Sequence, residues 1–176
     1  MAYTFSEPRA GLIPIASTDA GITPPNSATV IPTPPLRLGM IVRASDPTYG
    51  EGEFILLAGV ASTTVGSLVA YNATTYTTAL APVGTNIPRP IAVAMSANTS
   101  ASTWGWYQIS GIAVAAKSDQ VTTASAAIGI STAGFYNTTT TSSEIQGAIG
   151  VATTLSASGT GLIVINRPHM MGRITA

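Results

Sequence analysis

The chain has 176 residues, and only 14 of them are charged, seven basic and seven acidic, so the formal net charge is zero. Charged residues make up 8% of the chain, against roughly 25% of an ordinary soluble domain. A charge so sparse and balanced produces no long-range field, which argues against nucleic acid or an anionic membrane as the partner.

Few side chains are available for chemistry. There is one histidine, His169, one lysine, Lys117, and no cysteine, which excludes disulfides and leaves little from which to build a proton-transfer or metal site. No nucleophile elbow, phosphate loop, dinucleotide fingerprint or metal-ligand spacing is present. The sequence therefore predicts a protein that is not an enzyme and that binds no cofactor or metal.

The chain also lacks the patterns that direct a protein to membranes. No apolar run approaches the roughly 18 residues of a membrane helix, and the N-terminus lacks the basic and apolar regions of a signal peptide. We therefore expect a chain that is made in the host cytoplasm and kept soluble, with no membrane partner. Its 27 Ala, 26 Thr, 17 Ser and 17 Gly supply about half of the residues, and such small side chains favour thin, close-packed layers.

Residues 1–37 are predicted to form an extended arm. They contain seven of the twelve prolines, a density that forbids a helix or a central strand. Disordered tails are usually charged and poor in aliphatic residues, whereas this arm is rich in them and needs a surface to lie on. We expect that surface to be a neighbouring subunit or another protein, with the arm's own domain as the alternative. The candidate contact residues are Leu12, Ile13, Ile15, Ile22, Val30, Ile31 and Leu36.

Residues 38–168 are predicted to form a β-rich body. Short apolar runs alternate there with Gly, Ser, Thr and Asn, the spacing expected of an all-β sandwich or barrel of short antiparallel strands. No segment shows an apolar stripe with the 3.6-residue period of a helix. Strands are predicted near residues 38–43, 53–60, 67–71, 76–81, 90–96, 104–116, 127–131, 145–152 and 160–166.

A weak internal duplication is visible in this body. Residues 59–94 can be laid over residues 113–152, so that Tyr76 matches Tyr136 and the strand beginning at Ile91 matches the one beginning at Ile149. The pattern predicts two similar β half-modules packed together. The alternative is a chance alignment, because low-complexity sequences produce such matches readily.

Both tryptophans lie in the segment from Trp104 to Gly111. Strand periodicity directs Trp104 and Trp106 to one face and Tyr107 and Ile109 to the other. Large rings in this arrangement favour a core or an oligomer interface, and the alternative is an exposed ligand platform.

Residues 169–176 are predicted to be a C-terminal tail. Arg167, His169 and Arg173 make this end mildly basic, which fits pairing with carboxylates of a partner or, equally, an ordinary solvated terminus. We expect His169 to be a surface or interface histidine rather than a catalytic base.

Four stretches of the body together resemble a known family. They read GVASTTVGSLVAY at 59–71, RPIAVAM at 89–95, WGWYQISG at 104–111 and LIVINRP at 162–168. In pattern and composition they are similar to the capsid decoration, or cement, proteins encoded in the head modules of tailed bacteriophages. The similarity covers approximately residues 52–168 and includes no invariant signature.

The resemblance implies a small structural protein of the virion that binds the outer surface of an icosahedral capsid after expansion, commonly as a homotrimer. Its partner would be the major capsid protein, and its N-terminal arm would reach onto neighbouring capsid subunits. The family has no catalytic residues to carry over. The alternative function is a glycan- or receptor-binding module of a phage head or tail that uses Trp104, Trp106 and Tyr107.

Overall fold

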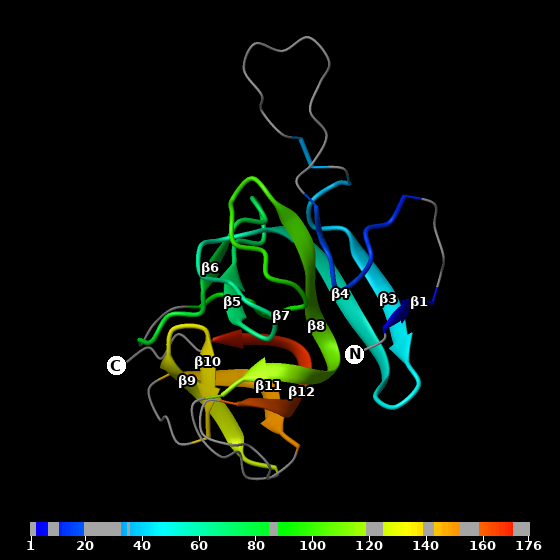
Figure 1. Cartoon of the computed structure of the whole chain (residues 1–176). Coiled ribbons are helices and arrows are strands. Elements are labelled where there is room, and N and C mark those ends of the chain that lie inside the picture. Colours follow the sequence, from blue (N-terminus) through cyan, green and yellow to red (C-terminus); the bar gives the residue numbers. More distant parts are fainter. Residues whose placement is uncertain are drawn as a thin grey trace.

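The computed structural model describes residues 3–6, 11–19, 33–34, 36–84, 88–118, 125–138, 143–151 and 159–170, without the side chains of Val114 and Ala115. Strands make up 56% of the structure, and the described residues include no helix. All strands belong to one antiparallel sheet, which curls into two lobes (Figure 1). The predicted all-β class is confirmed.

Nine strands of the body correspond to the nine predicted segments, with shifts of a few residues at their ends. They are β3 (Ile41–Asp46), β4 (Gly50–Ala58), β5 (Leu68–Tyr71), β6 (Thr78–Leu80), β7 (Ile91–Ala94), β8 (Trp104–Lys117), β9 (Ala127–Thr132), β11 (Glu144–Gly150) and β12 (Thr160–Met170). The sequence did not predict β10 (Phe135–Asn137) or two short strands of the arm, β1 (Thr4–Phe5) and β2 (Thr18–Asp19).

The body contains the same strand arrangement twice. We call β4 to β7 module one and β8 to β11 module two. In module one β5 pairs with β6 and β7, and β7 pairs with the next long strand, β8. In module two β9 pairs with β10 and β11, and β11 pairs with the next long strand, β12. The long strands β4, β8 and β12 also pair with one another in succession.

Each module closes on itself at an equivalent point. At the end of β4 the N–H of Ala58 donates to the carbonyl of Tyr76, and the Thr78 hydroxyl donates to the Ala58 carbonyl. Just beyond the end of β8, Ser118 bridges to Tyr136, and its hydroxyl donates to the Tyr136 carbonyl. The same 18 positions separate the two partners in both modules. Each module is thus a small, partly closed barrel.

The repeated topology fits the predicted half-modules, but the residue alignment does not follow the strands throughout. Tyr76 and Tyr136 occupy equivalent closing positions. In contrast, Ile91 begins β7 whereas Ile149 lies near the end of β11. Residues 59–62 follow β4, whereas their predicted counterparts, residues 113–116, lie within β8. The modules therefore differ in strand and loop length, which a short alignment of small residues did not reveal.

Strand β8 belongs to both modules. Its first half pairs with β4 and β7, and its second half pairs with β12. The change occurs near Gly111, which has a φ of +98°. A Cβ atom at this position would lie 2.5 Å from the Glu51 carbonyl oxygen, so both the backbone conformation and the close approach require glycine.

Three apolar clusters fill the protein. Module one encloses a cluster made of Ile55, Leu57, Val69, Ala92, Ala94, Tyr107 and Ile109. The second cluster lies between β4 and the N-terminal residues, and contains Tyr3, Ile13, Ile15, Ala44, Phe54, Leu56, Ala58, Met95, Trp104 and Trp106. The third fills module two and extends onto the outer side of β5 and β7. No single thick core forms, in keeping with the small side chains.

Candidate interaction surfaces

The aromatic segment of β8 is buried on both faces. Trp104 and Trp106 belong to the cluster beneath the N-terminal residues, while Tyr107 and Ile109 belong to the interior of module one. The predicted alternation of faces is therefore confirmed. Trp106 and Tyr107 are each 0% exposed, and Trp104 is 4% exposed.

This burial corrects the ligand-platform interpretation. Strand β8 lies in the middle of the sheet, and layers of the same chain cover both of its faces. The Trp106 indole N–H donates to the Ile13 carbonyl oxygen at 2.7 Å, and Phe5 packs edge-on against the Trp106 ring at 5.9 Å. Trp104, Trp106 and Tyr107 are therefore core residues of this chain and present no ring to a glycan or a second subunit.

The Tyr107 hydroxyl is part of a buried polar group around Asn98. With its oxygen turned toward Tyr107, the Asn98 amide accepts from the tyrosine hydroxyl at 3.0 Å and from the Gly59 N–H at 3.1 Å, and its nitrogen donates to Thr103 Oγ1 at 2.6 Å. Burial raises the pKa of Tyr107 to about 12. The hydroxyl stays protonated at neutral pH, and it anchors the turn between β7 and β8.

The described part of the N-terminal arm lies on its own body. Ile13 and Ile15 are buried in the cluster around Trp106, and Leu12 and Leu36 pack half-buried against it. The arm also adds strand β1 to the edge of β3 and strand β2 to the start of β8. For Ile13 and Ile15 the expectation of contact with a neighbouring subunit is corrected, because unpaired strand edges and the Trp106 face offer a surface within the same chain. Leu12 and Leu36 stay partly exposed, and their contact with a neighbouring subunit stays a prediction. Three further predicted contact residues lie outside the described residues: Ile22, Val30 and Ile31.

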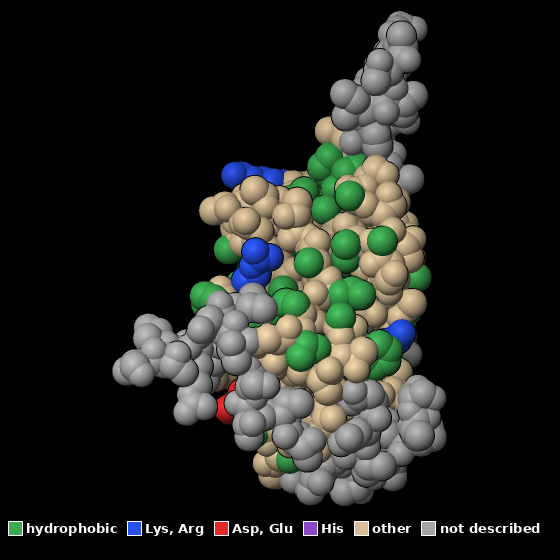
Figure 2. Space-filling model, turned by 90° about the vertical axis from the view of Figure 1, so that its left-hand side faces the viewer, with side chains coloured by type: hydrophobic (Ala, Val, Ile, Leu, Met, Phe, Trp, Pro, Cys, Tyr) green, Lys and Arg blue, Asp and Glu red, His purple; other side chains and the backbone are tan. Residues whose placement is uncertain are grey.

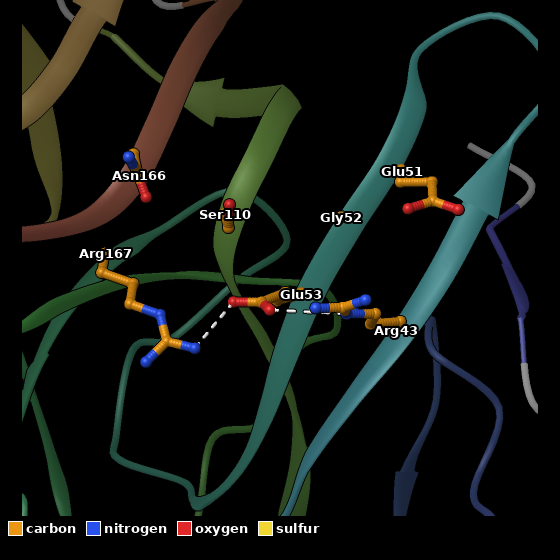
Figure 3. Close-up of a pocket in the computed structure, with 7 residues that line it drawn as sticks. All are labelled: Arg43, Glu51, Gly52, Glu53, Ser110, Asn166 and Arg167. Carbon is orange, nitrogen blue, oxygen red and sulfur yellow. Dashed lines mark hydrogen bonds and ion pairs between the residues drawn. The ribbon is translucent and has the colours of Figure 1, made fainter.

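A polar depression of about 400 Å³ crosses the middle of the sheet (Figure 3). Four neighbouring strands contribute to it: β3, β4, β8 and β12. Glu53 lies between two guanidinium groups, with Arg167 Nη2 at 3.0 Å from one carboxylate oxygen and Arg43 Nε at 3.6 Å from the other. The residues that line the polar depression are Arg43, Glu51, Gly52, Glu53, Ser110, Asn166 and Arg167.

The polar depression presents charged and polar side chains that can bind polar groups of a partner. Its two arginines and two glutamates balance in charge. The Arg43 and Arg167 side chains are more than half exposed, so their ion pairs contribute little to stability. Arg167 has a φ of 45°, a strained conformation for a residue with a side chain. The strain turns Arg167 toward Glu53 at a bulge where β12 pairs with β11.

Sequence reasoning missed this cluster, and it also misplaced the C-terminal boundary. Arg167 and Glu53 are 114 positions apart, and no local pattern links them. Strand β12 continues through His169 to Met170, and Met170 is only 1% exposed, so the body does not end at residue 168. The predicted tail began two residues too early because the apolar alternation of β12 is interrupted by Arg167 and Pro168. Arg173 lies outside the described residues.

An apolar depression lies on the outer side of β9, β11 and β12. Its volume is about 690 Å³, and Ile149, Val164 and Ala127 form its apolar part. Ile149 is 47% exposed. Polar residues border it: Ser125, Glu144, Gln146, Asn166 and His169. His169 is thus an exposed surface residue of this depression.

Comparisons with known proteins add no further assignment: no family model, curated protein or solved structure matches this chain. Among the described residues, no group of three or more His, Asp or Glu side chains is arranged to hold a metal ion. The same part of the chain includes no helix that could cross a membrane. The candidate sites in the described part of the chain are two depressions, the polar one around Glu53 and the apolar one around Ile149.

Proposed function

We propose that this protein is a structural virion protein that binds the outer surface of an assembled phage capsid and stabilises it. The proposal is supported by the resemblance of its body to capsid decoration proteins. It is also supported by surfaces that suit contact with another protein better than chemistry. The proposed partner is the major capsid protein, and no catalytic role is assigned to any residue.

The observation that carries this proposal is the exposure of aliphatic side chains on a body with few charges. Five such side chains are 36–53% exposed: Ile41, Val65, Val83, Ile149 and Val151. Figure 2 shows hydrophobic side chains spread over one face among uncharged atoms, with few charged groups. A surface of this kind binds through the burial of apolar area, and salt weakens such binding far less than it weakens charge pairing.

The arm takes a narrower role than its sequence predicted. Its residues 11–19 pack on the chain's own body. The proposed contact with the capsid is therefore assigned to the three predicted contact residues outside the described ones, Ile22, Val30 and Ile31. We propose that these contact neighbouring capsid subunits. Binding only to the assembled shell stabilises the shell by mass action, and a homotrimer would increase the affinity through effective concentration.

The test is to add the purified full-length protein to expanded heads that lack it. We expect it to sediment with the heads at micromolar concentration and physiological salt, and to raise the temperature at which the heads release DNA. Failure to bind under these conditions would contradict the proposed function.

A matched pair of variants tests the role of the arm. Changing Ile22, Val30 and Ile31 to Asp removes three aliphatic side chains and adds three carboxylates. The control changes Ser27, Ala28 and Thr29 to Asp, which adds the same charge and leaves the aliphatic side chains in place. We expect the first variant to bind heads at least tenfold more weakly than the control. Equal affinities would remove the arm from the capsid contact.

A further inference from the structure

We propose that the outer face of β9 and β11 is the surface through which this protein associates with a second copy of itself. The inference deepens the homo-oligomer named in the proposed function and rests on it only for that expectation. Its evidence is the internal repeat, because the repeat shows how the equivalent face is used elsewhere in the same chain.

In module one the outer face of β5 and β7 is fully covered. Leu68 and Ala70 on β5 and Ile91 and Val93 on β7 point away from the interior of module one, and each is at most 2% exposed. They join the apolar cluster of module two, together with residues such as Ile163. A face of this type in this chain is therefore a packing face, and β-structure of the same chain packs on it.

Among the described residues, the equivalent face of module two is exposed at Ala127 and Ile149. Ile128 on β9 points into module two as Val69 on β5 points into module one, so the residue before each points outward. That residue is Leu68 in module one, which is buried, and Ala127 in module two, which is exposed. Ile149 on β11 lies on the same outer face and is 47% exposed.

Apolar residues of this face form a continuous row, exposed at Ala127 and Ile149 and half-buried at Val164 and Ile112. Ile149 lies opposite Ala127 on β9 and opposite Val164 on β12, and Val164 lies opposite Ile112 on β8. The row therefore crosses four strands, and three of its residues, Ala127, Ile149 and Val164, line the apolar depression of about 690 Å³. Aliphatic residues bordered by amides and hydroxyls have the composition of an interface core with a polar rim.

A second copy fits this face on grounds of charge. Glu144 is the one acidic residue that lines the depression, and it lies at the opposite end of β11 from Ile149. The whole chain has zero net charge, so two copies approach without net repulsion. Copies related by a three-fold axis can gather this face at the axis, where apolar sheet faces pack as the layers of a β-sandwich do.

The experiment measures the oligomeric state of the full-length protein by light scattering and sedimentation, up to about 100 µM, a range that includes the affinities of most stable homo-oligomers. We compare Ile149→Lys with the matched control Ile41→Lys, because Ile41 is 45% exposed and lies on β3, away from module two. We expect the natural protein and Ile41→Lys to form the same oligomer. Ile149→Lys is expected to be monomeric with an unchanged circular dichroism spectrum and Tm.

A milder substitution guards against a folding artefact. Ile149→Thr keeps β-branching, which suits a strand, and is expected to raise the dissociation constant of the oligomer at least tenfold with no change in Tm. The inference would be overturned if the natural protein is monomeric, or if Ile149→Lys forms an oligomer of the natural mass. It would also be overturned if the Ile41→Lys control dissociates as much as Ile149→Lys does. Head binding is measured separately: a monomer that binds heads would overturn this interface alone, and an Ile149-dependent oligomer that does not bind heads would overturn the proposed function alone.

Discussion

Module one is enclosed on both sides, whereas module two is enclosed on one. Against module one lie the N-terminal residues and β3 on one side and module two on the other. The outer face of β9 and β11 has no such cover among the described residues. Two barrels with the same strand order thus have different surroundings, and the difference separates a structural core from a surface suited to partners.

Removing residues 1–19 should have the largest effect on this difference, because it uncovers module one. Tyr3, Ile13 and Ile15 would no longer cover the cluster around Trp106. Each such buried side chain contributes about 1.5–3 kcal/mol, so the loss is comparable to the stability of a small domain. We expect the truncated chain to be insoluble or to lose most of its stability to urea.

Single substitutions make the same test without shortening the chain. Ile13→Ala and Ile15→Ala should each lower the free energy of unfolding by about 2–4 kcal/mol, as measured by urea denaturation. An unchanged transition for both variants would mean that the arm is not part of the core in solution.

Replacing Gly111 should weaken the connection between the modules, with an effect smaller than that of the truncation. Gly111→Val places a branched side chain at a φ of +98° and against the Glu51 carbonyl. Strain and overpacking together should cost about 2–5 kcal/mol. Gly50→Val is the control, because Gly50 has a φ of +76° with nothing within 4 Å of its Cβ position. Equal losses in the two variants would show that only backbone strain matters at Gly111.

Alkaline titration should give the smallest effect and should report on module one. Burial raises the pKa of Tyr107 to about 12, above its ordinary value of about 10. Below pH 10 the hydroxyl is protonated in both the folded and the unfolded chain. As the pH rises from 10 toward 12, the unfolded chain releases the proton first, so stability falls by about 1.4 kcal/mol per pH unit.

The variant Tyr107→Phe isolates this contribution. It should lose about 1 kcal/mol at neutral pH, because the hydrogen bond to Asn98 is gone. Above pH 10 the stability of the variant should fall less steeply than that of the natural protein, because the Tyr107 hydroxyl no longer contributes. Some fall remains, since both proteins keep Tyr3 and Tyr71, whose pKa values burial also raises. Parallel curves for the two proteins between pH 8 and pH 12 would contradict the assignment.

The sequence predicted the strands because each is a short apolar run between turn residues, and it predicted the two faces of β8 because side chains alternate strictly along a strand. It did not predict what covers each face. Trp106 is a core residue only because Ile13, 93 positions earlier, lies over it, and nothing near Trp106 in the sequence encodes that contact. The cluster around Glu53 was missed for the same reason, since its charged members come from distant strands.

The hydrogen bond from Trp106 to Ile13 also affects how the chain folds during synthesis. The N-terminal residues leave the ribosome first, but their docking site on β8 is made about 90 residues later. Module one likewise cannot complete its barrel until β8 has been translated. Contacts so distant in sequence favour slow folding and leave apolar surface open for longer. Folding of the nascent chain must therefore wait for β8, the strand that both modules share.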